Sequence, residues 1–248
     1  MSAVIAIAKR ELLSLWVTPL AWLLLGLMTA LNGAAFVAIV TTLQETTESV
    51  IDLGPTQAFF GQSVFVPLGY LIFCPVLTMR SLSEERRSGT AETLLSTRAS
   101  ATAIVLGKYL SLVATFVVLW LPSVLYPVIL RNTGTIEWTV VASSYLGVLG
   151  LGFGFLAVGL YASALSSNQL VAAAVSGAVI AFFLVCGVAE RLFLEGPLHA
   201  IVSHVSVQSL LTEFAQGIVS SKRLVFMTSL VLVSLFFAAR AVERWRDE

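Results

Sequence analysis

The chain has 248 residues, of which 58% are hydrophobic and 11% are charged, and its formal net charge is zero. Soluble domains carry about a quarter charged residues, so this composition excludes an ordinary soluble domain and indicates an integral membrane protein. The zero net charge gives no indication of a nucleic-acid partner.

Five windows without Asp, Glu, Lys or Arg predict six membrane-spanning helices. They are residues 12–44, 53–79, 109–130, 138–189 and 224–239. A span needs roughly 20 apolar residues, and the fourth window would be about 78 Å long as one helix at ~1.5 Å per residue, which suits two spans. The runs are continuously apolar and too long for barrel strands. The predicted fold class is therefore an all-α polytopic membrane protein with one membrane domain over residues 1–248.

The first predicted element is a short helix over residues 3–16, here called the elbow. Its apolar residues share one helical face, and the charged residues beyond that face are Lys9, Arg10 and Glu11. This pattern is typical of a helix that lies in the membrane interface, with Pro19 separating it from the first span. The alternative is that these residues extend the first span.

The remaining elements follow in order. The spans are predicted at residues 19–40, 59–79, 106–130, 139–165, 169–189 and 224–240, with a charged segment at 80–100 and an outer helix at 206–218. The outer helix is predicted from an apolar stripe made of Val207, Leu210, Leu211, Phe214 and Ile218, and it lies at the outer surface or between the spans. Arg223 and Arg240 flank the last span, and each is expected to reach outward to the interface.

The distribution of Lys and Arg predicts the orientation. Ten of the fourteen lie on one side if both termini share that side with the charged segment. These ten are Lys9, Arg10, Arg80, Arg86, Arg87, Arg98, Lys108, Arg240, Arg244 and Arg246. Both termini and the charged segment are therefore predicted to be cytoplasmic.

The fourth span carries glycines at three- and four-residue spacing, including Gly147, Gly150 and Gly154. Small residues let helix backbones approach closely in lipid. Tight packing inside the bundle, a subunit interface and a mobile pathway helix are the three interpretations of this pattern.

No catalytic or metal-binding motif is evident. Gly107-Lys108 resembles the end of a Walker A motif, but Thr102 and Tyr109 stand where a glycine and a Ser or Thr are required, so this chain is not expected to bind ATP by that route. The carboxylates are not paired with His at metal-ligand spacing. The span interiors hold no ionisable residue, and Lys108 and Glu190 are assigned to span edges, which argues against an ion-coupled secondary carrier.

Four stretches together resemble one family. They are Glu84–Leu95 followed by Ile104–Lys108, Ala8–Leu12 with Pro19–Ala21, Gly159–Gln169, and Phe214–Ile218 with Arg240–Arg244. The chain resembles the permease subunits of ATP-binding-cassette (ABC) transporters of the second export class, and is most similar to the gliding-motility and copper-enzyme-maturation permeases. The likeness extends over nearly the whole chain.

The resemblance implies six spans with the elbow, a cytoplasmic coupling helix between the second and third spans, and short outer helices before the sixth. It also implies a second permease copy or a paralogue, and separate ABC ATPase subunits that hold ATP and magnesium, with no cofactor in this chain. The implied location is the bacterial inner (plasma) membrane.

The charged segment is where an ATPase subunit would dock, through a coupling helix. The contact residues are predicted to be Glu84, Glu85, Arg86, Gly89, Thr90, Glu92, Leu94 and Leu95. Gly89 permits a sharp turn, Thr90 is suited to cap a helix, and Glu92 suits its positive end. Leu94 and Leu95 form an apolar anchor ringed by charge. The alternative is a solvated loop that only satisfies the charge rule, and Ser100 is suited to cap the helix leading into the third span.

The predicted function is therefore ATP-driven transport, and export is the expected direction. A span interior without charges favours a lipid-like or amphipathic substrate, and membrane lipids are expected partners. The alternative is a mechanical or assembly complex that transmits force to a periplasmic partner without translocating anything.

Overall fold

The computed structural model describes residues 2–45, 54–89, 100–131, 137–192, 203 and 205–245. These residues contain helices and turns and no strand. Six of the helical stretches are long and apolar enough to cross a membrane. The predicted fold class, an all-α polytopic membrane protein, is confirmed.

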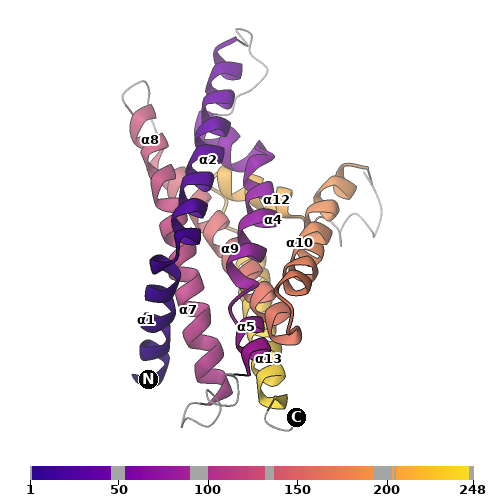
Figure 1. The fold of residues 1–248 in the computed structure, drawn as a ribbon. Helices are drawn as coiled ribbons and strands as arrows, with labels where there is room; N and C mark the ends of the chain where they lie inside the picture. The colour runs from indigo at the N-terminus through magenta and orange to yellow at the C-terminus, as the bar shows by residue number, and fades with distance from the viewer. Residues whose placement is uncertain are drawn as a thin grey trace.

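The helices form an elongated bundle (Figure 1). Their bounds are α1 Ser2–Val17, α2 Pro19–Glu45, α3 Pro55–Gln57, the π-helix η1 Ala58–Gln62, α4 Phe65–Thr78, α5 Ser83–Ser88, α7 Ala101–Trp120, the 3-10 helix η2 Leu121–Val124, α8 Leu125–Leu130, α9 Trp138–Leu165, α10 Gln169–Leu192, α12 Val207–Ala215 and α13 Ser221–Arg244. The two ends of the chain and α5 lie at the same end of the bundle (Figure 1).

Helix α9 is the centre of the bundle and packs against α4, α7, α10, α12 and α13. Its glycines explain how these neighbours come so close. A Cβ atom at Gly147 would lie 2.7 Å from Cβ of Phe214 in α12, and one at Gly150 or Gly154 would lie 2.7 Å from a side-chain atom of Met227 or Leu230 in α13. Among the three interpretations of these glycines, the structure places them in contacts inside a single chain.

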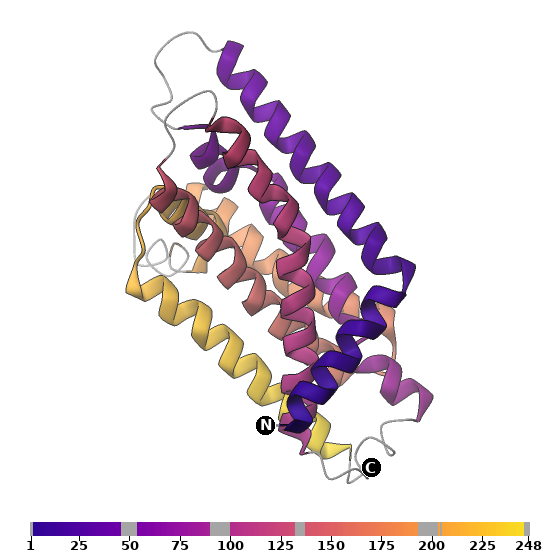
Figure 2. The ribbon, with the colours of Figure 1, turned by 90° about the vertical axis from the view of Figure 1, so that its left-hand side faces the viewer.

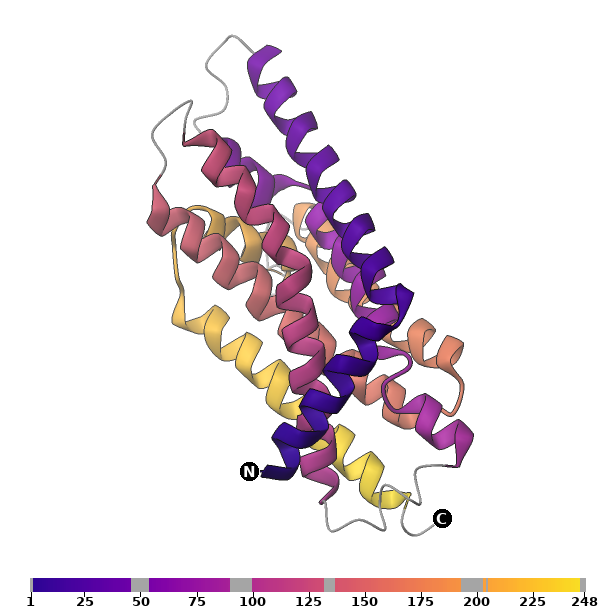
Figure 3. The same ribbon diagram turned by 60° about the vertical axis from the view of Figure 1, so that its left-hand side comes forward.

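The elbow helix α1 packs along α7, and α2 and α13 lie on opposite sides of the bundle (Figures 2 and 3). The close approach depends on Gly107 of α7, where a Cβ atom would lie 2.8 Å from Cβ of Ile7. The elbow is therefore held against the third span.

The second span differs from the single helix predicted over residues 59–79. The chain forms the π-helix η1, breaks at Ser63 and Val64, and only then continues as α4. Ser63 Oγ accepts a hydrogen bond from Phe65 N at 3.1 Å, so the serine side chain satisfies a donor at the start of α4. The prediction rested on the absence of charged residues from this stretch, and the polar pair Gln62-Ser63 at the break was not used.

The third span is also interrupted. Helix α7 starts at Ala101, five residues before the predicted start, and Ser100 caps it by accepting a hydrogen bond from Ala103 N at 3.2 Å. The capping role predicted for Ser100 is confirmed. At Leu121 the chain tightens into η2, which contains Pro122, before α8 resumes.

The outer helix α12 is tucked between the spans, packed against α9 and η1. Four of the five predicted stripe residues, namely Val207, Leu210, Leu211 and Phe214, are buried. Ile218 is exposed because α12 ends at Ala215 and Gly217 then adopts a positive φ of 82°. Thr212 Oγ1 donates to the carbonyl oxygen of Gly61 in η1 at 2.9 Å, which ties the two outer segments together.

Arg223 does not extend outward to the interface as predicted. It is 6% exposed, and its guanidinium makes two hydrogen bonds to the carboxylate of Glu213 in α12, at 2.8 and 3.0 Å. A planar guanidinium matches a carboxylate in this two-bond geometry. The start of α13 is therefore fixed to the outer helix.

The close approach of α9 to α4 at Gly159 provides a test of the packing. A Cβ atom at Gly159 would lie 2.2 Å from Oγ1 and 2.9 Å from Cβ of Thr78, a fully buried residue of α4. We predict that Gly159→Ala destabilises the protein by about 1–3 kcal/mol, as overpacking does, and lowers its melting temperature in detergent. Gly26→Ala is the matched control, because nothing lies within 4 Å of that position in α2. Equal melting temperatures for the two variants would contradict this packing.

Candidate functional site

The short helix α5 follows the second span, at the end of the bundle that holds both termini (Figure 1). Residues 79–82 form turns between α4 and α5, and these turns are held by Ser163 of α9. Its Oγ accepts hydrogen bonds from Leu82 N at 3.1 Å and Ser83 N at 3.0 Å, and it donates to Met79 O at 3.2 Å. One buried hydroxyl therefore satisfies three backbone groups that the interrupted helix would leave unpaired.

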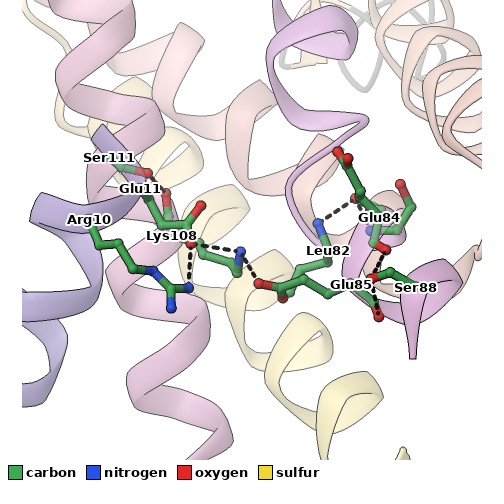
Figure 4. A network of polar contacts seen from close by, with 10 residues as sticks. Arg10, Glu11, Leu82, Glu84, Glu85, Ser88, Lys108 and Ser111 are labelled. Carbon is green, nitrogen blue, oxygen red and sulfur yellow. Dashed lines mark hydrogen bonds and ion pairs between the residues drawn. The ribbon is translucent and has the colours of Figure 1, made fainter. Parts of the chain in front are cut away.

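Lys108 of α7 is the most buried charge near this turn. It is 2% exposed, and its Nζ lies 2.8 Å from Glu85 Oε1 of α5 and 3.3 Å from Glu11 Oε1 of α1. Figure 4 shows the lysine extending between the two carboxylates, which come from different helices. Arg10 completes the group through a 2.9 Å contact from Nη2 to Glu11 Oε1. We call Arg10, Glu11, Glu85 and Lys108 the Lys108 cluster.

The Lys108 cluster is balanced in charge, with two cations and two carboxylates. Burying an ion costs several kcal/mol unless well-placed partners compensate, so the single buried ammonium requires both acids. The hydrogen bond to Glu11 raises the pKa of Arg10 above its ordinary value, while partial burial opposes that rise. The cluster thus fixes α1, α5 and α7 relative to one another.

Arg86 attaches the other side of α5. Its Nη1 donates to the carbonyl oxygen of Leu165, at the end of α9, at 3.3 Å. Its guanidinium carbon lies 5.8 Å from the ring centroid of Trp245, just beyond α13, within the range of a cation–π contact. Helix α5 therefore contacts residues of the third and fourth spans and Trp245 after the sixth, and it is linked to the elbow through Lys108.

The predicted site residues have different positions. Glu85, Arg10 and Glu11 come together in the Lys108 cluster, while Arg86 makes the contacts described above. Glu84 is exposed and pairs with Arg80 at 3.3 Å, and Lys9 is exposed. Gly89 ends α5 with a positive φ of 70°, the left-handed conformation that glycine adopts most readily. Thr90, Glu92, Leu94 and Leu95 lie outside the described residues.

Two residues of the site were not predicted from the sequence. Lys108 was assigned to the edge of a span starting at residue 106, but α7 begins at Ala101, so the lysine lies two turns inside the helix. Nothing in the sequence around Ser163 indicated its hydrogen bonds to the turns before α5, because it is one of several small residues in a row. The one available signal for Lys108 was that Glu11 and Glu85 sit near other span ends on the same predicted side.

Comparison with known proteins adds an independent finding. Residues 41–202 match a family model described as "ABC-2 family transporter protein". The matched region includes α5, Lys108 and Ser163. A search of curated proteins returned no match.

The Lys108 cluster can be tested by removing its centre. Lys108→Met should leave the mostly buried carboxylate of Glu85 without its lysine partner and Glu11 with Arg10 alone, and so destabilise the protein by about 3 kcal/mol. Thermal unfolding in detergent should show a large drop in melting temperature. Adding Glu85→Gln to Lys108→Met should recover part of the loss, because one unpaired charge is then removed.

The control is Arg240→Gln, which breaks a solvent-exposed ion pair with Glu243 and should change stability little. If Lys108→Met unfolds at the same temperature as Arg240→Gln, the cluster does not fix these helices.

Proposed function

The chain belongs to the ABC-2 transporter family, and on that premise we propose that it is the permease of an ATP-driven exporter whose spans are moved through α5. As a membrane permease subunit of an ABC transporter, it has an ABC ATPase partner implied by its family, and such permeases usually dimerise. Export, the coupling route and the cytoplasmic position of both termini belong to the proposal.

The observation that carries the proposal is the ion pairing of Lys108 with Glu11 and Glu85. A force on the segment that follows Gly89 reaches α5 first. From α5 it passes through Glu85 to Lys108 and so to α7, and through Glu11 to the elbow. Ser163 and Arg86 carry it to α9 and to the end of α13. Movement of α5 thus displaces several spans together.

Each subunit has a separate chemical task in this proposal. The ATPase subunit holds ATP and magnesium, and its closure supplies the work. This chain supplies no catalytic group. It supplies a polar attachment that survives at the membrane surface because each of its charges has an opposite charge beside it.

Docking of the ATPase subunit is expected on residues 90–97, with Leu94 and Leu95 as the apolar anchor. Hydrophobic anchors supply most interface energy, and the charges around them guide encounter. The exposed charges of α5, such as Glu84 and Arg87, would then lie at the rim of that contact.

The docking proposal predicts that replacing Leu94 and Leu95 by Asp releases the ATPase subunit. Losing two buried leucines should cost about 3 kcal/mol or more, which weakens binding by about 100-fold or more. Co-purification of the permease and the ATPase subunit from membranes measures this. Ile218→Asp with Val219→Asp is the control, since this exposed apolar pair lies beyond α12, at the other end of the bundle.

Full retention of the ATPase subunit by the Leu94 and Leu95 variant would remove the coupling assignment. Loss of the subunit by both double variants would indicate a general effect of added charge, and would equally count against the anchor.

A further inference from the structure

A pocket of about 380 Å³ is lined in part by all four residues of the Lys108 cluster. Its walls come from four parts of the chain: α1, the start of α2, the region from α4 to α5, and α7. The volume lies within the range of small-ligand sites. The pocket has no role in the force path described above.

The pocket is charged at one end and apolar at the other. Along α7, Lys108 comes first and Leu112 and Thr115 follow. Helix α4 runs the opposite way, so Val76 and Leu77 precede the charged turn and α5. In both helices the charged residues lie at the end of the bundle that holds the two termini (Figure 1). The apolar residues of the pocket wall lie toward the middle of the spans.

The charges that line the pocket cancel. Three are cationic and three are anionic, namely Arg10, Arg80 and Lys108 against Glu11, Glu84 and Glu85. Arg10 and Arg80 are the more exposed cations, with side chains 62% and 44% exposed, whereas Lys108 is buried. The more exposed part of the pocket, its mouth, therefore holds Arg10, Arg80 and Glu84, and its inner part holds the carboxylates of Glu11 and Glu85 beside one ammonium.

We propose that this pocket binds the head group of a zwitterionic phospholipid that carries a primary amine. Its phosphate accepts hydrogen bonds from the guanidinium groups at the mouth, the arrangement in which Arg recognises phosphate most readily. Its ammonium donates to the carboxylates of Glu11, Glu84 or Glu85. The first part of the acyl chain lies against the apolar walls, which include Leu15, Leu24 and Leu112.

The lining discriminates between head groups. A purely anionic head group would meet three carboxylates with no cation of its own to offer them. A quaternary ammonium donates no hydrogen bond and is recognised by aromatic rings, and no aromatic side chain is among the described residues that line the pocket. A primary ammonium has three donors and suits this lining better.

The ligand is a membrane lipid because the pocket changes from charged to apolar in the same direction as a lipid molecule does, from its head group to its acyl chains. The charged end faces the surface and the apolar end faces the spans, as in a lipid of the adjacent leaflet. That leaflet is the cytoplasmic one in the proposed orientation, while the ligand class does not depend on orientation. A lipid seated here touches α1, α5 and α7 together, so it adds to the attachment made by the Lys108 cluster.

The experiment is native mass spectrometry of the full chain purified in mild detergent and supplied with equal amounts of phosphatidylethanolamine, phosphatidylcholine and phosphatidylglycerol. The wild type should retain phosphatidylethanolamine over the other two. Ser14→Trp places an indole in the pocket, from an exposed position that makes no other described contact, and should reduce retention about tenfold. Leu13→Trp, on an exposed neighbouring residue that does not line the pocket, should retain the lipid.

A second pair of variants tests the charge. Arg80→Gln should reduce retention about threefold, as expected for a half-exposed charge, while Arg240→Gln, from a comparably exposed ion pair, should have no effect. Equal retention of the three lipids, or undiminished retention in both Ser14→Trp and Arg80→Gln, would overturn the proposal. Tight binding of soluble glycerophosphoethanolamine in place of the lipid would overturn the assignment to a membrane lipid.

Discussion

The ammonium group of Lys108 is the constraint on which one end of the bundle, the end that holds both termini (Figure 1), depends. It is buried, and an unpaired buried charge is too costly to keep, so the positions of Glu11 and Glu85 follow from it. These acids belong to helices that are distant in sequence, in the elbow and after the second span. Satisfying one lysine therefore places three helices. Gly107, the residue before it, lets α1 approach closely enough for Glu11 to reach the ammonium.

The remaining contacts of α5 extend this attachment across the bundle. Ser163 forms hydrogen bonds with backbone groups of the turns between α4 and α5, and Arg86 contacts both the end of α9 and Trp245. The opposite end of the bundle is fixed in a similar way, because Arg223 and Glu213 join α13 to the outer helix. Close glycine packing along α9 connects the two polar layers. In the proposed mechanism, a displacement at one end is passed along these closely packed helices to the other.

Much of the fold follows from the sequence because membrane physics is strict. Charge-free windows of sufficient length leave few alternatives to helices, and this sufficed to predict six spans and an all-α class. The interruption at Ser63 was not predicted, because η1 packs against α12, which is distant in sequence. The interruption at Leu121 does have a local signal in Pro122, which lacks the backbone N–H that the interior of an α-helix needs. The charged residues of α5 were named from the sequence, but the residues with which they pair were not. Lys108 lies inside its helix only because α7 begins at Ala101, and a difference of one or two turns decides whether a lysine reaches water or requires two carboxylates.

The central claim is that α1 and α5 move as one unit with α7 when the ATPase subunit closes. Electron-paramagnetic-resonance distance measurements test it most directly, on the complex with its ATPase subunit, using spin labels on cysteines introduced at Leu13 and Arg87 after Cys74 and Cys186 are replaced. A reference pair at Leu13 and Val185, an exposed residue of α10, reports whether the spans move at all. The account predicts one Leu13–Arg87 distance that stays the same without nucleotide and with trapped ATP, while the Leu13–Val185 distance changes. A Leu13–Arg87 distance that differs between the two states would contradict it.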